Sequence, residues 1–256
     1  MKALRIDLPP ALDPTAALFI DVDGTLVEIA ARPELVRVQP GLPALLDRLA
    51  EQRDGALALV SGRPLLQIDR LFAPWLGAAA GLHGAQRRRP DGGIASDGEN
   101  PAEIAAAAAL DRLRPAFAAF AGARPGVWLE DKGATLALHY RAAPEREAEI
   151  RELGEKSIRA AGGALRMIAG KMVVELQPRC HGKDHAVAAF MAEPPFRGRV
   201  PVFLGDDTTD EDGFAEVNRR GGMSVRVGEA IGPTAADYLL PSVRGVHEWL
   251  EQSLRR

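Results

Sequence analysis

The sequence predicts an α/β protein in which a doubly wound parallel sheet forms the core and a separate α+β unit is inserted into it. Short apolar runs alternate with helical segments over residues 16–82 and again over residues 181–254, as in parallel sheets covered by helices on both faces. Between these stretches the order changes to helix, hairpin, helix, hairpin, which indicates an α+β unit. We assign residues 1–87 and 179–256 to the core and residues 88–178 to the inserted unit.

The first part of the core is expected to contain three strands joined by two helices. Leu42, Leu45 and Leu49 recur at the spacing of one helical face, and the apolar runs around them are short enough for buried strands. The expected strands are residues 16–20, 56–60 and 76–82, and the expected helices are residues 41–52 and 65–72. Ligands of such sheets bind beyond the carboxyl ends of the strands, so polar residues at these ends are candidate site residues.

Turn residues and apolar periodicity predict the remaining elements. A segment rich in Gly, Asp and Pro, residues 90–100, separates the core from the inserted unit. In the inserted unit we expect helices at residues 101–120 and 144–161 and hairpin strands at residues 127–130, 135–140, 164–168 and 172–176. After it we expect helices at residues 181–192, up to 219 and at 243–254, with strands at residues 200–204, 223–227 and 238–240. Pro201 is compatible with a strand only near its beginning, because proline donates no ladder hydrogen bond.

Composition and charge restrict the class of partner. A formal net charge of −3 with mixed signs gives no field that would recruit nucleic acid or an anionic membrane. No stretch approaches the roughly 20 apolar residues that span a bilayer, and the single cysteine, Cys180, leaves no disulfide within the chain. We therefore expect a cytoplasmic monomer that acts on a small molecule, with no nucleic-acid or membrane partner. The basic triplet Arg87-Arg88-Arg89 is expected to lie in a solvated loop.

Two carboxylates follow the first strand directly, in the sequence DVDGT of residues 21–25. Because strand side chains alternate, Asp21 and Asp23 leave the strand on the same side, and Gly24 permits a sharp turn after them. Two carboxylates this close repel each other, so either a cation lies between them or one of them holds a proton. The pair is therefore a candidate nucleophile, acid/base pair or ligand set for a hard metal ion. The alternative is a solvated turn, since Asp and Gly are common turn residues.

Further polar residues occur at the ends of other strands and at the start of a helix. Ser61 closes the second strand, Lys183 opens the helix after the inserted unit, and Asp206 and Asp207 follow the strand at residues 200–204. Such a set suits a phosphate monoester, a dianion that needs a divalent cation, a lysine and hydroxyl donors around it. Mg²⁺ prefers oxygen ligands and keeps several waters, which suits a site with few carboxylates. Taken singly, each residue also has a structural explanation as a loop, a surface helix start or a helix cap.

The order of these motifs resembles that of the haloacid dehalogenase-like superfamily of phosphatases, and the resemblance spans nearly the whole chain. It implies that Asp21 attacks phosphorus and becomes an aspartyl-phosphate. Asp23 would protonate the leaving oxygen and then deprotonate the hydrolytic water. Ser61 and Lys183 would be the other catalytic residues.

The same resemblance implies a Mg²⁺ site. Three oxygen ligands are implied: a carboxylate of Asp21, the backbone carbonyl of Asp23 and a carboxylate of Asp206. Asp207 and Asp210 would orient the metal ligands or Lys183. The inserted unit would be a cap that closes over the strand ends and selects the leaving group.

Several segments are also similar to trehalose-6-phosphate phosphatases, namely residues 81–84, 130–132, 138–141, 170–175 and 205–218. This resemblance implies that Glu130, Lys132 and Glu175, with Arg141, bind the sugar hydroxyls. Carboxylates accept hydrogen bonds from hydroxyls and lysine donates to them, so the residue types fit a disaccharide. Gln86 departs from the pattern, where an acidic residue is expected, and puts a functional role at that position in doubt.

The leading hypothesis is a Mg²⁺-dependent phosphatase of trehalose 6-phosphate. A second hypothesis keeps the core chemistry for another sugar phosphate, either as a phosphatase of sucrose phosphate, mannosyl phosphoglycerate or a hexose phosphate, or as a phosphomutase. A third is a sugar-phosphate-binding module without turnover, against which the complete set of core carboxylates and lysine argues. The cap residues have an alternative as polar hairpin ends. His83 and His139 are interpreted as structural residues.

Overall fold

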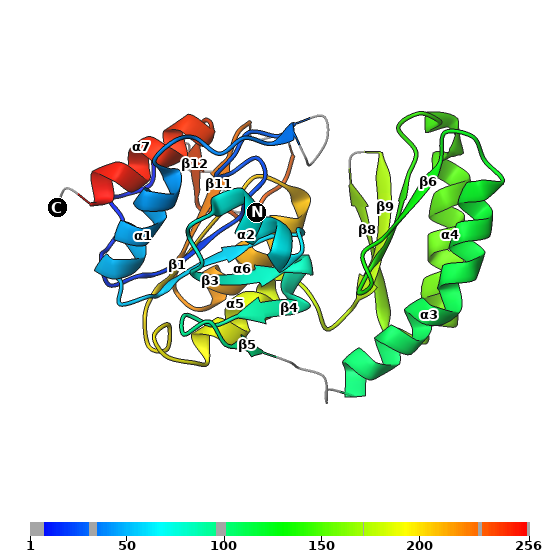
Figure 1. Ribbon diagram of the computed structural model, residues 1–256, viewed down its shortest axis with the longest axis horizontal. Helices are drawn as coiled ribbons and strands as arrows, with labels where there is room; N and C mark the ends of the chain where they lie inside the picture. Colours follow the sequence, from blue (N-terminus) through cyan, green and yellow to red (C-terminus); the bar gives the residue numbers. More distant parts are fainter. Residues whose placement is uncertain (1–7, 31–34, 96–100, 171, 230–231, 255–256) are drawn as a thin grey trace. The chain divides into compact units, whose positions relative to one another are not determined.

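The computed structural model describes residues 8–30, 35–95, 101–170, 172–229 and 232–254 (Figure 1). The chain divides into two compact units, Met1–Ala95 with Gly182–Arg256 (unit 1) and Ser96–His181 (unit 2). The end of the expected linker, residues 96–100, and Lys171 of the second expected hairpin turn lie outside the described residues. Among the described residues, no helix combines the length and the apolar character that crossing a membrane would require.

Unit 1 contains an eight-stranded sheet of order β12-β11-β10-β1-β2-β3-β4-β5. In this order, the six strands from β12 to β3 pair in parallel with their neighbours. β4 and β5 add an antiparallel hairpin at the β3 edge of the sheet. The strands are β1 Ala17–Ile20, β2 Leu57–Val60, β3 Ala78–Gly81, β4 Gln86–Arg88, β5 Ile94–Ala95, β10 Pro201–Gly205, β11 Met223–Val227 and β12 Tyr238–Leu240. Pro201 is the first residue of its strand, as its missing N–H requires.

Helices cover both faces of this sheet (Figure 1). They are α1 Leu42–Gln52, α2 Leu65–Phe72, α5 Lys183–Met191, α6 Glu211–Arg219 and α7 Val243–Ser253, with short 3₁₀ turns η2 Leu82–Gly84 and η4 Thr208–Asp210. Side chains alternate along β1, so Leu18 and Ile20 join the core under α1, α2 and α7, while Ala17 and Phe19 join the core under α5 and α6. The predicted doubly wound α/β fold is confirmed by this arrangement.

Two of the three residues of the basic triplet lie in a strand, so the expectation of a solvated loop is wrong for Arg87 and Arg88. Arg87 and Arg88 belong to β4 and are each 6% exposed. Arg87 pairs with Glu193 at 2.9 Å and Arg88 with Asp69 at 2.6 Å, and these ion pairs allow the guanidinium groups to be buried. Because β4 and β5 pair with β3, unit 1 extends to Ala95, whereas the sequence analysis began the inserted unit at residue 88.

Unit 2 contains a four-stranded antiparallel sheet of order β6-β7-β9-β8, with two helices on one face. The elements are α3 Pro101–Gly122, β6 Trp128–Asp131, β7 Leu136–His139, η3 Pro144–Arg146, α4 Glu147–Ala160, β8 Leu165–Gly170 and β9 Val173–Pro178. Leu138, Val174 and Leu176 point toward the helices and form one core with them. The opposite face carries the row Glu130, Ala137 and Glu175, which the strand register places side by side.

Phe19 belongs to the core of unit 1 that lies under α5 and α6. It is fully buried and stacks on Phe196, with ring centroids 5.4 Å apart. We predict that Phe19→Ala lowers the free energy of unfolding by about 3–5 kcal/mol, because it leaves a cavity against the facing aromatic rings. Urea unfolding followed by circular dichroism measures the change. Leu66→Ala is the control, since Leu66 is 59% exposed and should cost less than about 1 kcal/mol; equal losses would contradict the packing described.

Candidate active site

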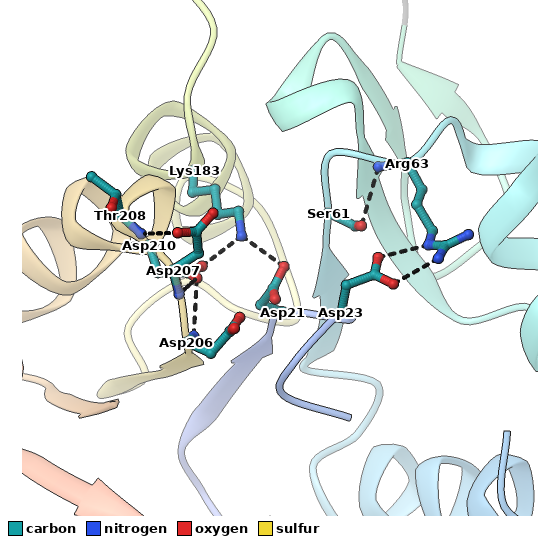
Figure 2. Close-up of polar contacts among 9 residues, drawn as sticks. All are labelled: Asp21, Asp23, Ser61, Arg63, Lys183, Asp206, Asp207, Thr208 and Asp210. Carbon is teal, nitrogen blue, oxygen red and sulfur yellow. Dashed lines mark hydrogen bonds and ion pairs between the residues drawn. The ribbon is translucent and has the colours of Figure 1, made fainter. Parts of the chain in front are cut away.

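The carboxyl ends of three neighbouring parallel strands bring acidic and hydroxyl side chains to one edge of the unit 1 sheet (Figure 2). Asp21 follows β1, Ser61 follows β2 and Asp206 follows β10. Backbone pairing holds their positions: Asp21 N–H donates to the Leu204 carbonyl and Ser61 N–H to the Ala80 carbonyl, both at 2.9 Å. The site is therefore set by the ends of the most deeply buried strands.

Lys183, the first residue of α5, lies between two carboxylates of this edge. Its Nζ donates to Asp21 Oδ1 at 2.6 Å and to Asp210 Oδ1 at 2.5 Å. All three side chains are buried. Burial alone would lower the pKa of Lys183, but the two carboxylates outweigh it and raise the pKa, so the ammonium stays charged. Burial raises the pKa of Asp21 well above its usual value, with Lys183 opposing this and Asp210 and Asp206 adding to it.

Asp210 builds the loop after β10. Its Oδ2 accepts from the backbone N–H groups of Asp206 and Asp207, at 3.1 and 2.9 Å, while Oδ1 accepts from Lys183. Gly205 makes this possible, because a Cβ there would lie 2.2 Å from Asp210 Cγ. Asp207 is exposed and accepts from Thr208 N–H at 2.7 Å, so it caps η4. Asp207 and Asp210 were both expected to orient the metal ligands or Lys183. Asp210 contacts Lys183, whereas the side chain of Asp207 caps the start of η4.

The residues present fit a hard divalent cation. Carboxylate oxygens of Asp21, Asp206 and Asp210 lie within 4.8 Å of one another. Asp206 Oδ1 is buried and has no hydrogen-bond partner among the described residues. Burial, with the charge of Asp210, raises the pKa of Asp206 to about 7, as expected where three carboxylates share one ammonium. Since both oxygens of Asp210 are already engaged, Asp21 and Asp206 are the side chains left to bind a cation.

Asp23 is held by a residue that the sequence analysis did not identify. Arg63 Nε and Nη2 donate to the two carboxylate oxygens of Asp23, each at 2.6 Å (Figure 2). The Arg63 side chain is 11% exposed, and its backbone N–H donates to Ser61 Oγ at 3.1 Å. Its position could have indicated a role in the site, because Arg63 follows the same strand as Ser61, at the edge of the sheet where the other charged site residues lie.

Two further residues near this edge have structural contacts. Gln86 Oε1 accepts from Leu65 N–H at 2.9 Å, so this side chain satisfies the first N–H of α2. His83 has φ 56° and its backbone N–H donates to the Ser61 carbonyl at 3.0 Å. Gly62 leaves room for the imidazole, because a Cβ there would lie 2.7 Å from His83 Nε2. These contacts shape the loop that carries Ser61.

The polar residues expected in the inserted unit form a cluster on the helix-free face of the unit 2 sheet. Lys132 Nζ lies 3.4 Å from Glu175 Oε2 and 3.8 Å from Glu130 Oε2. His139 joins them, with Nε2 2.9 Å from Glu130 Oε2, and this hydrogen bond holds the pKa of Glu130 below its usual range although burial opposes it. Glu175 Oε1 is buried with no hydrogen-bond partner among the described residues. We call Glu130, Lys132, His139 and Glu175 the polar cluster of unit 2.

Trp128 contacts this cluster, and Arg141 lies two residues beyond His139 in the chain. The indole of Trp128 stacks on the imidazole of His139, with ring centroids 3.9 Å apart. This contact places a flat aromatic surface, 54% exposed at Trp128, beside the carboxylates. Arg141 lies in the exposed turn after β7. Sequence analysis assigned His139 to the strand face without a site role, because its pairing with Glu130 depends on the register of β6 and β7.

Comparison with known sequences points to one family. The family model for trehalose-phosphatase matches residues 19–243. The chain is 45% identical to a probable trehalose-phosphate phosphatase of Sinorhizobium fredii, over 90% of this chain and 84% of that protein. It is 44% identical to the trehalose-6-phosphate phosphatase of Escherichia coli, over 94% of this chain and 88% of that protein.

Solved structures agree. A trehalose-6-phosphate phosphatase related protein superposes with a TM-score of 0.73 at 27% identity, covering 93% of this chain and 96% of its own. The C-terminal domain of trehalose-6-phosphate phosphatase from C. albicans has the same fold, with a TM-score of 0.78 at 22% identity and coverage of 96% and 98%. The resemblance stated from the motifs is thus confirmed, and the chain belongs to the trehalose-phosphatase family of phosphoric monoester hydrolases.

Proposed function

We propose that this protein hydrolyses trehalose 6-phosphate to trehalose and phosphate through an aspartyl-phosphate on Asp21, with Mg²⁺ bound at the strand ends. The observation that carries the proposal is the buried group in which Lys183 joins Asp21 to Asp210 beside the unpaired Asp206 Oδ1. Its excess of negative charge suits a cation that in turn receives a phosphate dianion. The names of the two relatives that are 45% and 44% identical support the choice of substrate.

Asp21 has one oxygen available for attack on phosphorus. Its Oδ1 accepts from Lys183, which orients the carboxylate and opposes the rise in pKa that burial causes. No described residue donates to Oδ2, so this oxygen can form the bond to phosphorus while the bond from phosphorus to the sugar oxygen breaks. Water then attacks the aspartyl-phosphate, which releases phosphate and restores the carboxylate. A Mg²⁺ ion held by Asp21, Asp206 and the backbone carbonyl of Asp23 would neutralise charge on the phosphoryl oxygens.

Ser61 and the start of α5 supply donors for the phosphoryl group. Ser61 Oγ accepts from Arg63 N–H, so its own proton remains available to a phosphoryl oxygen. Lys183 is the first residue of α5, where unpaired backbone N–H groups favour an anion. Asp210 acts through Lys183 and the backbone of the β10 loop and is assigned a positioning role, as is Asp207 through its cap of η4.

Asp23 is assigned the proton transfers of both steps. It would protonate the sugar oxygen as that oxygen leaves and then take a proton from the attacking water. Both of its oxygens accept from Arg63 in the structure described. The pair therefore has to open on at least one side before Asp23 donates, and we assign Arg63 the role of positioning Asp23.

Unit 2 is proposed to act as the cap that selects the sugar. The polar cluster offers carboxylate acceptors at Glu130 and Glu175 and an ammonium donor at Lys132, which suits a ligand with many hydroxyls. The buried, unpaired Glu175 Oε1 is an acceptor ready for a hydroxyl. Arg141 remains a proposed sugar contact from the family resemblance.

We predict that Asp21→Asn lowers phosphate release from trehalose 6-phosphate by about 10³-fold or more, because the amide cannot form the covalent intermediate. EDTA should abolish release by the unaltered protein, and added Mg²⁺ should restore it. The assay compares trehalose 6-phosphate, sucrose 6-phosphate and glucose 6-phosphate. Asp54→Asn, at a side chain 83% exposed, is the matched control and should keep full activity. Release that survives EDTA, or a preference for another sugar phosphate, would count against the proposal.

We predict that Glu175→Gln raises the KM for trehalose 6-phosphate about 10- to 100-fold, since a hydrogen bond to a charged group contributes about 1.5–3 kcal/mol. Hydrolysis of p-nitrophenyl phosphate, which has no sugar, should change less than about threefold if unit 1 alone performs the chemistry. Glu155→Gln on α4, at a side chain 58% exposed, is the matched control. An equal loss with both substrates would show that Glu175 supports the fold and does not contact the sugar.

We predict that Arg63→Ala lowers kcat for trehalose 6-phosphate by about tenfold or more with a smaller change in KM, because Asp23 loses its orientation for proton transfer. Arg63→Lys should not restore the rate, because lysine cannot engage both oxygens of a carboxylate at once. Full rescue of the rate by lysine would mean that Arg63 supplies only positive charge and does not orient Asp23.

A further inference from the structure

Unit 2 contains a second group of metal-binding side chains, separate from the polar cluster on its sheet. Glu103 lies in the first turn of α3, and Cys180 and His181 follow β9. Their ligand atoms, a carboxylate oxygen, the thiol sulfur and an imidazole nitrogen, all lie within 4.8 Å of one another. None of these three residues has a part in the chemistry proposed above.

His181 is the centre of this group. It is 8% exposed, and its Nε2 lies 3.2 Å from Glu103 Oε1. Its Nδ1 is buried and has no hydrogen-bond partner among the described residues. A buried imidazole nitrogen without a partner costs free energy unless something else binds it. One nitrogen of the ring thus lies beside Glu103 and the other has no described partner, and a neutral imidazole can bind a metal ion through either nitrogen.

Cys180 connects this group of residues to a cavity. It is half-buried and lines a cavity of about 470 Å³ whose other residues are small or lie at turns, namely Ala102, Ala105, Gly162, Gly163, Ala164 and Arg179. The guanidinium of Arg179 is turned to the backbone, with Nε donating to the Gly163 carbonyl at 3.1 Å. The cavity therefore offers a route from solvent to the thiol.

The types of ligand select the class of ion. Sulfur, imidazole nitrogen and carboxylate oxygen together are ligands of Zn²⁺, whereas Mg²⁺ takes oxygen ligands only. With bonds of about 2.0–2.3 Å, neighbouring ligands of a tetrahedral zinc site lie about 3.3–3.8 Å apart. His181 Nε2 and Glu103 Oε1 are 3.2 Å apart, just below this spacing. The thiol sulfur lies within 4.8 Å of the other two ligand atoms and has to move closer to them on binding.

We propose that Cys180, His181 and Glu103 bind a divalent cation of the zinc class, with solvent in the fourth position. On binding, the thiol releases its proton to solvent and binds as the thiolate. The ion would join the first turn of α3 to the segment that directly precedes Gly182, where the chain re-enters unit 1. This site is distinct from the carboxylate site of unit 1 in both its residues and the metal it takes.

Cobalt(II) tests the proposal, because it occupies zinc sites and a thiolate bound to it gives a charge-transfer absorption in the near ultraviolet. Cys180 is the only cysteine of the chain, so this absorption reports on one residue. The reduced full-length protein is titrated with Co²⁺ in excess Mg²⁺, which keeps the carboxylate site of unit 1 filled. We expect the band to saturate at one cobalt per chain and to disappear on addition of Zn²⁺.

Variants separate a built site from a lone thiol. Cys180→Ser should abolish the band, and Glu103→Gln and His181→Asn should each weaken cobalt binding about tenfold or more. Glu155→Gln and His185→Asn, at side chains 58% and 52% exposed, are the matched controls and should bind as the unaltered protein does. Circular dichroism of each variant confirms that it is folded.

Three results would overturn the proposal. The first is the absence of a thiolate band in the unaltered protein. The second is a band whose titration is unchanged by Glu103→Gln and His181→Asn, which would mean that Cys180 binds cobalt alone. The third is saturation at one cobalt per two chains, which would place the ion between molecules. None of these results bears on the proposed phosphatase, because phosphate release is not part of the measurement.

Discussion

The ammonium group of Lys183 connects parts of unit 1 that are distant in sequence. It donates to Asp21 at the end of β1 and to Asp210 after β10, from the first turn of α5. Asp210 in turn holds the backbone of the β10 loop, and Gly205 leaves the space for it. Removing Lys183 would leave two buried carboxylates without their cationic partner, and breaking a buried ion pair in this way typically costs about 3–5 kcal/mol. The same contacts that orient the proposed nucleophile therefore also stabilise the sheet edge.

The strands of the parallel sheet could be predicted because they are buried on both faces and therefore consist of apolar runs that end in polar residues. The hairpin of β4 and β5 at the edge of this sheet could not be predicted in the same way. Arg87 and Arg88 resemble a solvated loop, and their burial depends on Glu193 and Asp69, which are distant in sequence or lie on another element. A charged strand of this kind is recognised only when its ion-pair partners are known in space.

The residues of the candidate site also fall into those that local sequence predicts and those that it does not. Asp21, Asp206 and Lys183 were identified because strand ends and helix starts can be located from sequence. The pairing of Arg63 with Asp23 and of His139 with Glu130 depends on side-chain direction and strand register, which local sequence does not determine. In the same way, nothing local distinguishes Asp207, which caps a turn, from its buried neighbour Asp210.

The order of strands also has a consequence for synthesis on the ribosome. β1 lies at the centre of its sheet between β2 and β10, and Ala17 pairs with Pro201. β1 cannot pair with β10 until the chain has been made through Gly205, whereas the described strand pairs of unit 2 form within residues 128–178. Because domains fold as units during synthesis, unit 2 is able to fold while β1 has β2 beside it but still lacks β10. During this time the backbone groups of β1 that later pair with β10 have no strand partner on that side.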